Sequence, residues 1–119
     1  MKKVMIVEDS SLMIAVISNF IKKEGKEVQI IEAHNGDEAV EKYKTEKPNL
    51  VFMDIKMPGK DGITALEEIR KDDSSAKVVM CTSLKEEEQE TRAKKAGCVA
   101  YIMKPFSRQD IVDAINKHL

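Results

Sequence analysis

Residues 50–62 read LVFMDIKMPGKDG, a short apolar run that ends on the carboxylate of Asp54. Pro58 and Gly59 follow soon afterwards, and this pair interrupts regular structure. Because the run is too short for a stable helix, it predicts a buried strand that leads into a loop. Open parallel sheets carry their chemistry at the carboxyl ends of the strands. Asp54 is therefore either a turn-forming or capping residue or a reactive group, and the rest of the chain has to decide between these readings.

Length and composition predict one globular domain that spans residues 1–119. Apolar residues make up 42% of the chain, charged residues make up 34%, and the formal net charge is −1. This balance lacks the basic patch of a protein that binds nucleic acid or an anionic membrane. The longest apolar run, residues 12–17, is far shorter than a membrane span, and the N-terminus does not resemble a signal peptide. We therefore expect a cytoplasmic protein without nucleic-acid or membrane partners, with Cys81 and Cys98 as reduced thiols.

Apolar patterns and capping residues alternate regularly along the chain. They predict strands over residues 3–7, 28–33, 50–53, 77–81 and 99–103. Helices are expected over residues 12–23 and 85–95 and in the stretches that begin after Asn35, Asp61 and Ser107, which are typical N-caps. Strict alternation of strands and helices is typical of an α/β fold, in which helices cover both faces of a parallel sheet.

Polar side chains follow four of the five expected strands. Glu8 and Asp9 follow the first strand, Asp54 the third, Thr82 the fourth and Lys104 the fifth. In a parallel sheet these positions share one edge, where three carboxylates would repel each other unless a cation such as Mg²⁺ lay among them. A cation, a lysine and a hydroxyl are the groups that would stabilise a phosphoryl group on a carboxylate. Any one of these residues could be a simple turn or cap residue, but their gathering favours a phosphoryl-transfer site.

Four motifs carry a resemblance to a known family. They are Val7-Glu8-Asp9-Ser10, the segment 53–58 with Asp61-Gly62, Thr82-Ser83, and the segment 101–106. In this order they make the whole chain resemble the receiver domain of two-component response regulators, especially the single-domain CheY-like kind. The resemblance implies a flavodoxin-like, doubly wound (βα)5 fold with a five-stranded parallel sheet in the strand order 2-1-3-4-5.

The resemblance also implies a set of roles. Asp54 would accept a phosphoryl group from a phosphohistidine of a sensor histidine kinase or a histidine phosphotransfer protein. Mg²⁺ would be bound by Asp9, Asp54 and the backbone carbonyl of Lys56, with Glu8 acting through a water molecule.

The remaining implied roles concern the switch. Thr82 and Lys104 would bind the phosphoryl oxygens, and Tyr101 would turn inward behind Thr82. The surface of the fourth helix, fifth strand and fifth helix would then bind a downstream target, such as a flagellar motor, chemotaxis or phosphorelay protein. The protein would act as a monomer and would not be an enzyme beyond its own phosphoryl transfer and slow self-dephosphorylation.

Two pairs of residues have further candidate roles. Lys56 and Leu84 lie where the family tunes hydrolysis of the aspartyl phosphate, and a long cation with a bulky aliphatic group would hinder the attacking water. Met13 and Ile14 either pack against the sheet or form an apolar patch where the kinase docks.

Two other functions remain as alternatives. A small aspartyl-phosphate phosphohydrolase uses a similar residue set, but places an Asp-x-Asp pattern after the first strand, where this chain has Glu8-Asp9-Ser10. A flavodoxin-like redox carrier needs a phosphate-binding loop at that place, which an acidic loop would repel, and aromatic rings, whereas this chain has no Trp. The sequence leaves open which kinase and which target the protein serves.

Overall fold

The computed structural model describes residues 1–83 and 86–119, which contain five strands and five helices in alternation. The strands are β1 (Lys2–Val7), β2 (Val28–Ala33), β3 (Leu50–Met53), β4 (Val78–Thr82) and β5 (Ala100–Met103). The helices are α1 (Ser11–Lys23), α2 (Gly36–Glu46), α3 (Gly62–Asp72), α4 (Glu87–Lys95) and α5 (Arg108–His118). The predicted alternation is confirmed, with small displacements at the ends of several elements.

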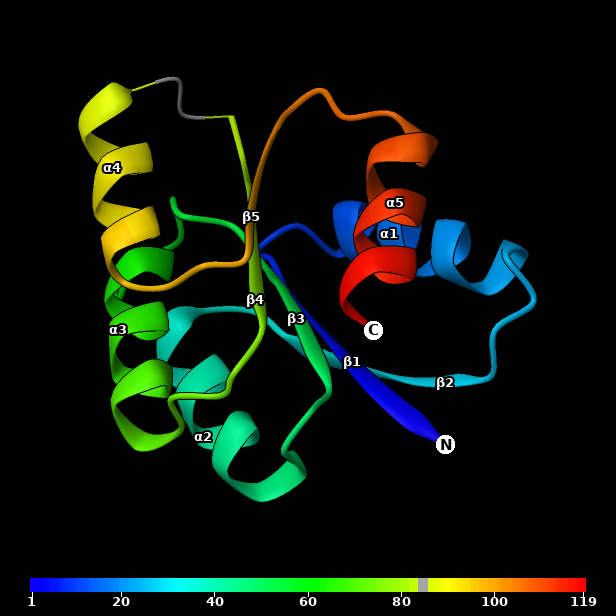
Figure 1. Ribbon diagram of the computed structural model, residues 1–119, viewed down its shortest axis with the longest axis horizontal. Helices are drawn as coiled ribbons and strands as arrows, with labels where there is room; N and C mark the ends of the chain where they lie inside the picture. Colours follow the sequence, from blue (N-terminus) through cyan, green and yellow to red (C-terminus); the bar gives the residue numbers. More distant parts are fainter. Residues whose placement is uncertain (84–85) are drawn as a thin grey trace.

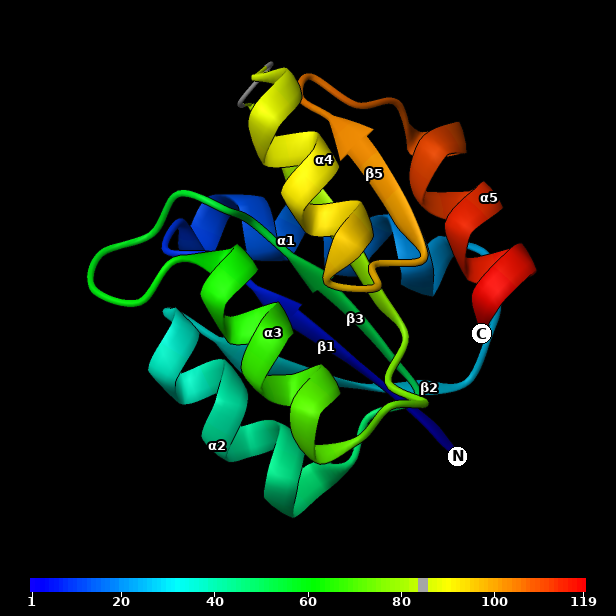
Figure 2. The same cartoon turned by 60° about the vertical axis from the view of Figure 1, so that its left-hand side comes forward.

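The strands form one parallel sheet in the order β2-β1-β3-β4-β5. Helices α1 and α5 cover one face of the sheet, and α2, α3 and α4 cover the other (Figure 1). The turned view shows the same two helical layers with the sheet between them (Figure 2). The predicted fold class and strand order are thus confirmed.

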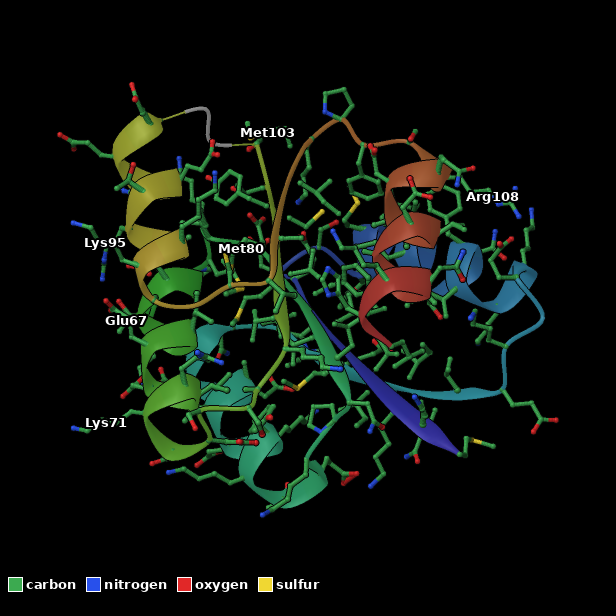
Figure 3. All side chains as sticks on the ribbon, viewed as in Figure 1. Glu67, Lys71, Met80, Lys95, Met103 and Arg108 are labelled. Carbon is green, nitrogen blue, oxygen red and sulfur yellow. The ribbon has the colours of Figure 1, made fainter. Side chains whose placement is uncertain are left out.

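A separate apolar core lies on each face of the sheet. Side chains of a strand alternate between the faces, so Leu50 and Phe52 of β3 join the core under α1 and α5, whereas Val51 and Met53 join the core under α2 and α3. Met80 of β4 belongs to the second of these cores and lies in the interior in Figure 3. All residues of β3 and β4 are buried, as expected for central strands of a sheet that is covered on both sides.

Polar caps fix where most helices begin. The side chain of each of four N-cap residues accepts a hydrogen bond from a backbone N–H of the first helical turn: Ser10, Asn35, Asp61 and Ser107. Ser107, a predicted N-cap, also forms a reciprocal capping box with Asp110. Because each cap lies in a loop that leaves the carboxyl edge of the sheet, the caps also set the length and course of the loops that surround this edge.

No helix in the described part of the chain combines the length and the apolar character needed to cross a membrane.

Candidate functional site

The register of the sheet brings the polar strand ends together. Val7 pairs with Met53, so Glu8 and Asp54 leave neighbouring strands at the same level. The backbone ladder continues one step further, because Asp54 N–H donates to the Val7 carbonyl over 3.1 Å. On the other side of β3, Lys104 N–H donates to the Thr82 carbonyl over 2.8 Å. The predicted gathering of these residues at one sheet edge is therefore present in the structure.

Lys104 bridges two of the carboxylates. Its Nζ lies 2.5 Å from Glu8 Oε2 and 3.2 Å from Asp54 Oδ2. The other oxygen of Asp54, Oδ1, accepts a hydrogen bond of 2.8 Å from the N–H of Ile55, which fixes the orientation of the carboxylate. Glu8 and Asp54 are buried, whereas Asp9 is exposed. The acidic cluster thus has two buried carboxylates and one, that of Asp9, in contact with solvent.

Burial and charge act against each other at this site. Desolvation raises the pKa of Glu8 to about 7, although the hydrogen bond from Lys104 opposes this effect, and the negative charge of Asp54 adds to it. Burial by itself would lower the pKa of Lys104, but the hydrogen bond to Glu8 and the charge of Asp54 hold it above its usual value. Lys104 is therefore charged, and it compensates only part of the negative charge of the cluster.

The three carboxylates fit a hard divalent cation. Glu8, Asp9 and Asp54 each offer an oxygen, and these oxygens all lie within 4.8 Å of one another. Mg²⁺ takes oxygen ligands and is commonly bound through one or two carboxylates together with water. Since Lys104 supplies one positive charge to three carboxyl groups, a cation beside the exposed Asp9 would complete the charge balance.

The two predicted switch residues lie on neighbouring strands. Thr82 ends β4 and is fully buried. Tyr101 lies in β5 and pairs with Met80 in the sheet register. It packs against the core under α2 and α3. Burial raises the pKa of Tyr101 above its usual value. Thr82 therefore ends the strand next to that of Asp54, whereas Tyr101 lies one strand further away, on the edge strand β5.

The structure distinguishes between the two candidate roles of Ile14. Ile14 is only 3% exposed and belongs to the core under α1 and α5, so it packs against the sheet and does not offer a docking surface. Ile14, Ile17 and Ile21 share the face of α1 that packs on the sheet, because their spacing follows the helical period. Leu12 lies on the opposite face and is 76% exposed. Met13 is half-buried against the same core, so its docking role stays a prediction.

The structure describes one of the two residues predicted to tune hydrolysis of the aspartyl phosphate. Lys56 is exposed in the loop between β3 and α3, and its role stays a prediction. Leu84 lies outside the described residues. The free thiols are as expected, with Cys81 buried and Cys98 half-buried.

Sequence reasoning missed two sets of contacts. It assigned Lys104 to a phosphoryl group, but did not predict that the lysine bridges Glu8 and Asp54 without one. It also passed over Lys60, which lies in the loop that follows Asp54 and forms ion pairs with Asp37 and Glu68. Lysines and acidic residues are frequent in this chain, so no local signal singled out these pairs.

The family model for the response regulator receiver domain matches residues 4–116. The chain belongs to this family. The receiver domain is 44% identical to the chemotaxis protein CheY of Bacillus subtilis over 117 residues, which cover 98% of this chain and 97% of that protein. It is 45% identical to CheY of Thermotoga maritima over 116 residues, which cover 98% of this chain and 96% of that protein.

Solved structures agree with this assignment. The receiver domain is similar to the structure of a CheX-CheY-BeF3-Mg complex from Borrelia burgdorferi, with a TM-score of 0.90, 31% identity and coverage of 98% of this chain and 87% of that one. It is also similar to a CheY-like receiver domain from Methanospirillum hungatei, with a TM-score of 0.89, 32% identity and coverage of 98% and 92%. Family and fold thus place the protein in two-component signalling.

Proposed function

We propose that the protein is a phosphorylation-dependent signalling switch whose phosphoacceptor is Asp54. The observation that carries this proposal is the cluster of Glu8, Asp9 and Asp54 at the carboxyl edge of the sheet, in which Glu8 and Asp54 contact the ammonium group of Lys104. One oxygen of Asp54 is held by the Ile55 N–H, and the other faces Lys104. The carboxylate is thereby oriented by a backbone hydrogen bond and lies beside a cation, as phosphoryl transfer requires.

The phosphoryl donor is a phosphohistidine of a sensor histidine kinase or a histidine phosphotransfer protein. An oxygen of Asp54 forms the new P–O bond, the P–N bond breaks, and the released imidazole takes up a proton. Asp9, Asp54 and the backbone carbonyl of Lys56 would hold Mg²⁺, with Glu8 acting through water, and the bound ion supplies charge neutralisation for the phosphoryl oxygens. Support for this ion comes from the mutual distances of the three carboxylates.

Lys104 and Thr82 complete the site. The ammonium group of Lys104 leaves its present partner Glu8 and pairs with a phosphoryl oxygen, and the hydroxyl of Thr82 donates to another. Tyr101 then turns inward behind Thr82, and the surface of α4, β5 and α5 binds a downstream target. Two relatives are named as chemotaxis proteins, which supports a chemotaxis target. On this proposal the protein works as a cytoplasmic monomer, and the only reactions that it catalyses are its own phosphorylation and dephosphorylation.

The test compares the wild-type protein with Asp54→Asn. The wild-type protein should become phosphorylated by a small-molecule phosphodonor such as acetyl phosphate only when Mg²⁺ is present, and intact-protein mass spectrometry measures the gain of one phosphoryl group. Asp54→Asn, which keeps the shape of the side chain, should gain none. Phosphorylation of wild type that is independent of Mg²⁺, or equal phosphorylation of the variant, contradicts the proposal. Steady turnover of a small phosphomonoester would favour the phosphohydrolase alternative.

A further inference from the structure

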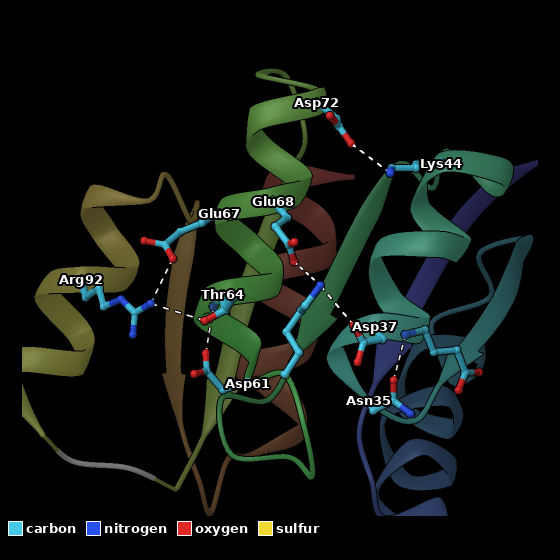
Figure 4. A network of polar contacts seen from close by, with 11 residues as sticks. Asn35, Asp37, Lys44, Asp61, Thr64, Glu67, Glu68, Asp72 and Arg92 are labelled. Atoms are coloured by element: carbon cyan, nitrogen blue, oxygen red, sulfur yellow. Dashed lines mark hydrogen bonds and ion pairs between the residues drawn. The ribbon is translucent and has the colours of Figure 1, made fainter.

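An ion-pair clamp of three residues holds the loop that follows Asp54. Lys60 Nζ lies 3.2 Å from Asp37 Oδ1 on α2 and 2.5 Å from Glu68 Oε2 on α3. Figure 4 shows Asp37 and Glu68 on adjacent helices, each joined by a dashed line to the same ammonium group. We call Asp37, Lys60 and Glu68 the Lys60 clamp. It ties one loop residue to two helices at once.

The loop also packs tightly against α2 where the clamp lies. A Cβ atom added at Gly36, the first residue of α2, would lie only 2.4 Å from the carbonyl oxygen of Lys60. The backbone at Lys60 therefore rests directly on the first turn of α2, and only a glycine leaves room for this approach. The clamp thus holds the loop in contact with the helix.

The far end of the same loop touches the phosphoacceptor. Gly62 N–H donates to the Ile55 carbonyl over 2.8 Å, and a Cβ atom at Gly62 would lie 1.9 Å from the carbonyl oxygen of Asp54. Ile55 in turn donates its N–H to Asp54 Oδ1. A shift of the loop would therefore be transmitted to the backbone and the carboxylate of Asp54, and also to Lys56 within the loop.

The charges of the clamp depend on Lys60. Its side chain is only 22% exposed, and Glu68 Oε2 is shielded from solvent. The side chains of Asp37 and Glu68 are 71% and 44% exposed, so without the ammonium group their carboxylates would repel each other only weakly across solvent. The loss of Lys60 should therefore release the loop from both helices, because its two ion pairs are lost together.

We propose that Lys60 is a positioning residue that, through the loop 54–61, sets the affinity of the acidic site for its divalent cation. The inference rests on the proposed function, because it assigns the loop a part in holding that cation. The proposed role of Lys60 differs from that of an ion pair that only links two helices. The chain contains such an ion pair, which serves as a control. Lys44 on α2 lies 3.6 Å from Asp72 on α3, away from the loop, as Figure 4 shows.

The experiment is a Mg²⁺ titration followed by amide chemical shifts in NMR spectra. We expect Lys60→Met, which keeps most of the apolar stem, to raise the Mg²⁺ dissociation constant about tenfold, the lower end of the range for residues that orient metal ligands. Lys60→Arg should restore a value near that of wild type. Lys44→Met, which removes the other ion pair between α2 and α3, should leave the dissociation constant unchanged even if it lowers the urea midpoint.

The outcomes separate this inference from the proposed function. A wild-type protein that binds no Mg²⁺ contradicts the proposed function itself. Wild-type binding with an unchanged dissociation constant in Lys60→Met overturns the positioning role alone, as does an equal loss in Lys44→Met. If Lys60→Met does not fold, the milder Asp37→Asn replaces it, since it breaks the contact with α2 and leaves the pair with Glu68. An unchanged dissociation constant in that variant would then overturn the inference.

Discussion

At the scale of single residues, Lys104 controls the charge of the acidic site. It comes from the strand next to that of Thr82, and its ammonium group contacts Glu8 and Asp54 at the same time. Its side chain is only 15% exposed, so these contacts are shielded from solvent, and each is worth more than an ion pair on the surface. The same group is available to a phosphoryl oxygen, so Lys104 links the unphosphorylated site to the phosphorylated one.

Replacement of Lys104 by methionine should slow phosphorylation of Asp54 by about 100-fold, the usual cost of losing one preorganised charge-stabilising donor. The measurement is the rate of phosphoryl gain from a small-molecule donor at saturating Mg²⁺. Lys95→Met is the matched control, because Lys95 is exposed at the end of α4 and points away from the molecule in Figure 3. Equal rates for Lys104→Met and the control would rule out this role.

A second prediction at the residue scale concerns the lifetime of the phosphoryl group on Asp54, which we expect Lys56 and Leu84 to prolong. The long cationic side chain of Lys56 is exposed in the loop after Asp54, where it would hinder an attacking water. We expect Lys56→Asn and Leu84→Glu each to lose the phosphoryl group faster than the parent protein, as measured by its decay after removal of the donor. If both variants decay no faster than the parent, these residues do not slow hydrolysis.

At the scale of secondary-structure elements, α4 buries fewer residues than any other helix that the structure describes. Among the residues that the structure describes in α4, Ala93 is the one that is buried, whereas α3 buries five. Its N-cap residue, Glu86, makes no side-chain capping hydrogen bond. A contact of 3.0 Å between Arg92 and Glu67 joins α4 to α3, but both side chains are about half exposed, so this ion pair adds little stability. The helix therefore has little apolar burial to hold it in one position.

This weak attachment predicts that amide hydrogens of α4 exchange with solvent before those of α3. The physical reason is that local opening of α4 exposes little apolar surface, so it costs less free energy than opening of α3. Hydrogen exchange followed by NMR on the unphosphorylated protein measures the order directly. Protection in α4 equal to that in α3 would show that the helix is as firmly held as its neighbour, and would weaken its assignment to the switch surface.

At the scale of the whole molecule, one sheet separates two apolar cores and carries the acidic site at the carboxyl ends of its strands. Phe52 fills the core under α1 and α5, while its neighbours Val51 and Met53 fill the other core. Because both cores share the central strands, damage to one should lower the stability of the whole domain. The residues of the acidic site come directly after these strands. Because both cores hold the strands in place, the geometry of the site depends on both cores.

Phe52→Ala should therefore lower the free energy of unfolding by about 3–5 kcal/mol, the usual cost of truncating a buried aromatic residue. Urea unfolding should remain a single transition when followed both by far-ultraviolet circular dichroism and by tyrosine fluorescence, since Tyr43 and Tyr101 lie in the opposite core. Leu12→Ala is the control, because this exposed residue should change stability by less than about 0.5 kcal/mol. Separate transitions for the two probes would contradict the coupling.

Much of the fold and of the site is readable from local patterns. Alternating apolar segments and caps predicted the elements because burial and capping act over a few neighbouring residues. The polar residues at the strand ends followed from the same pattern, since parallel strands all present their carboxyl ends at one edge. The strand order rested on the family resemblance instead, because periodicity along one strand carries no information about which strand lies beside it.

What local patterns could not supply are contacts between distant parts of the chain. Glu8 and Lys104 are 96 positions apart, and their contact exists only because the sheet places the ends of β1 and β5 within reach of one another. The burial of Ile14 depends on how α1 is rotated against the sheet, which neighbouring residues alone do not reveal. The sequence alone therefore predicted Asp54 as the reactive carboxylate, whereas packing between elements placed Lys104 beside it and brought Lys60 of the following loop into contact with α2 and α3.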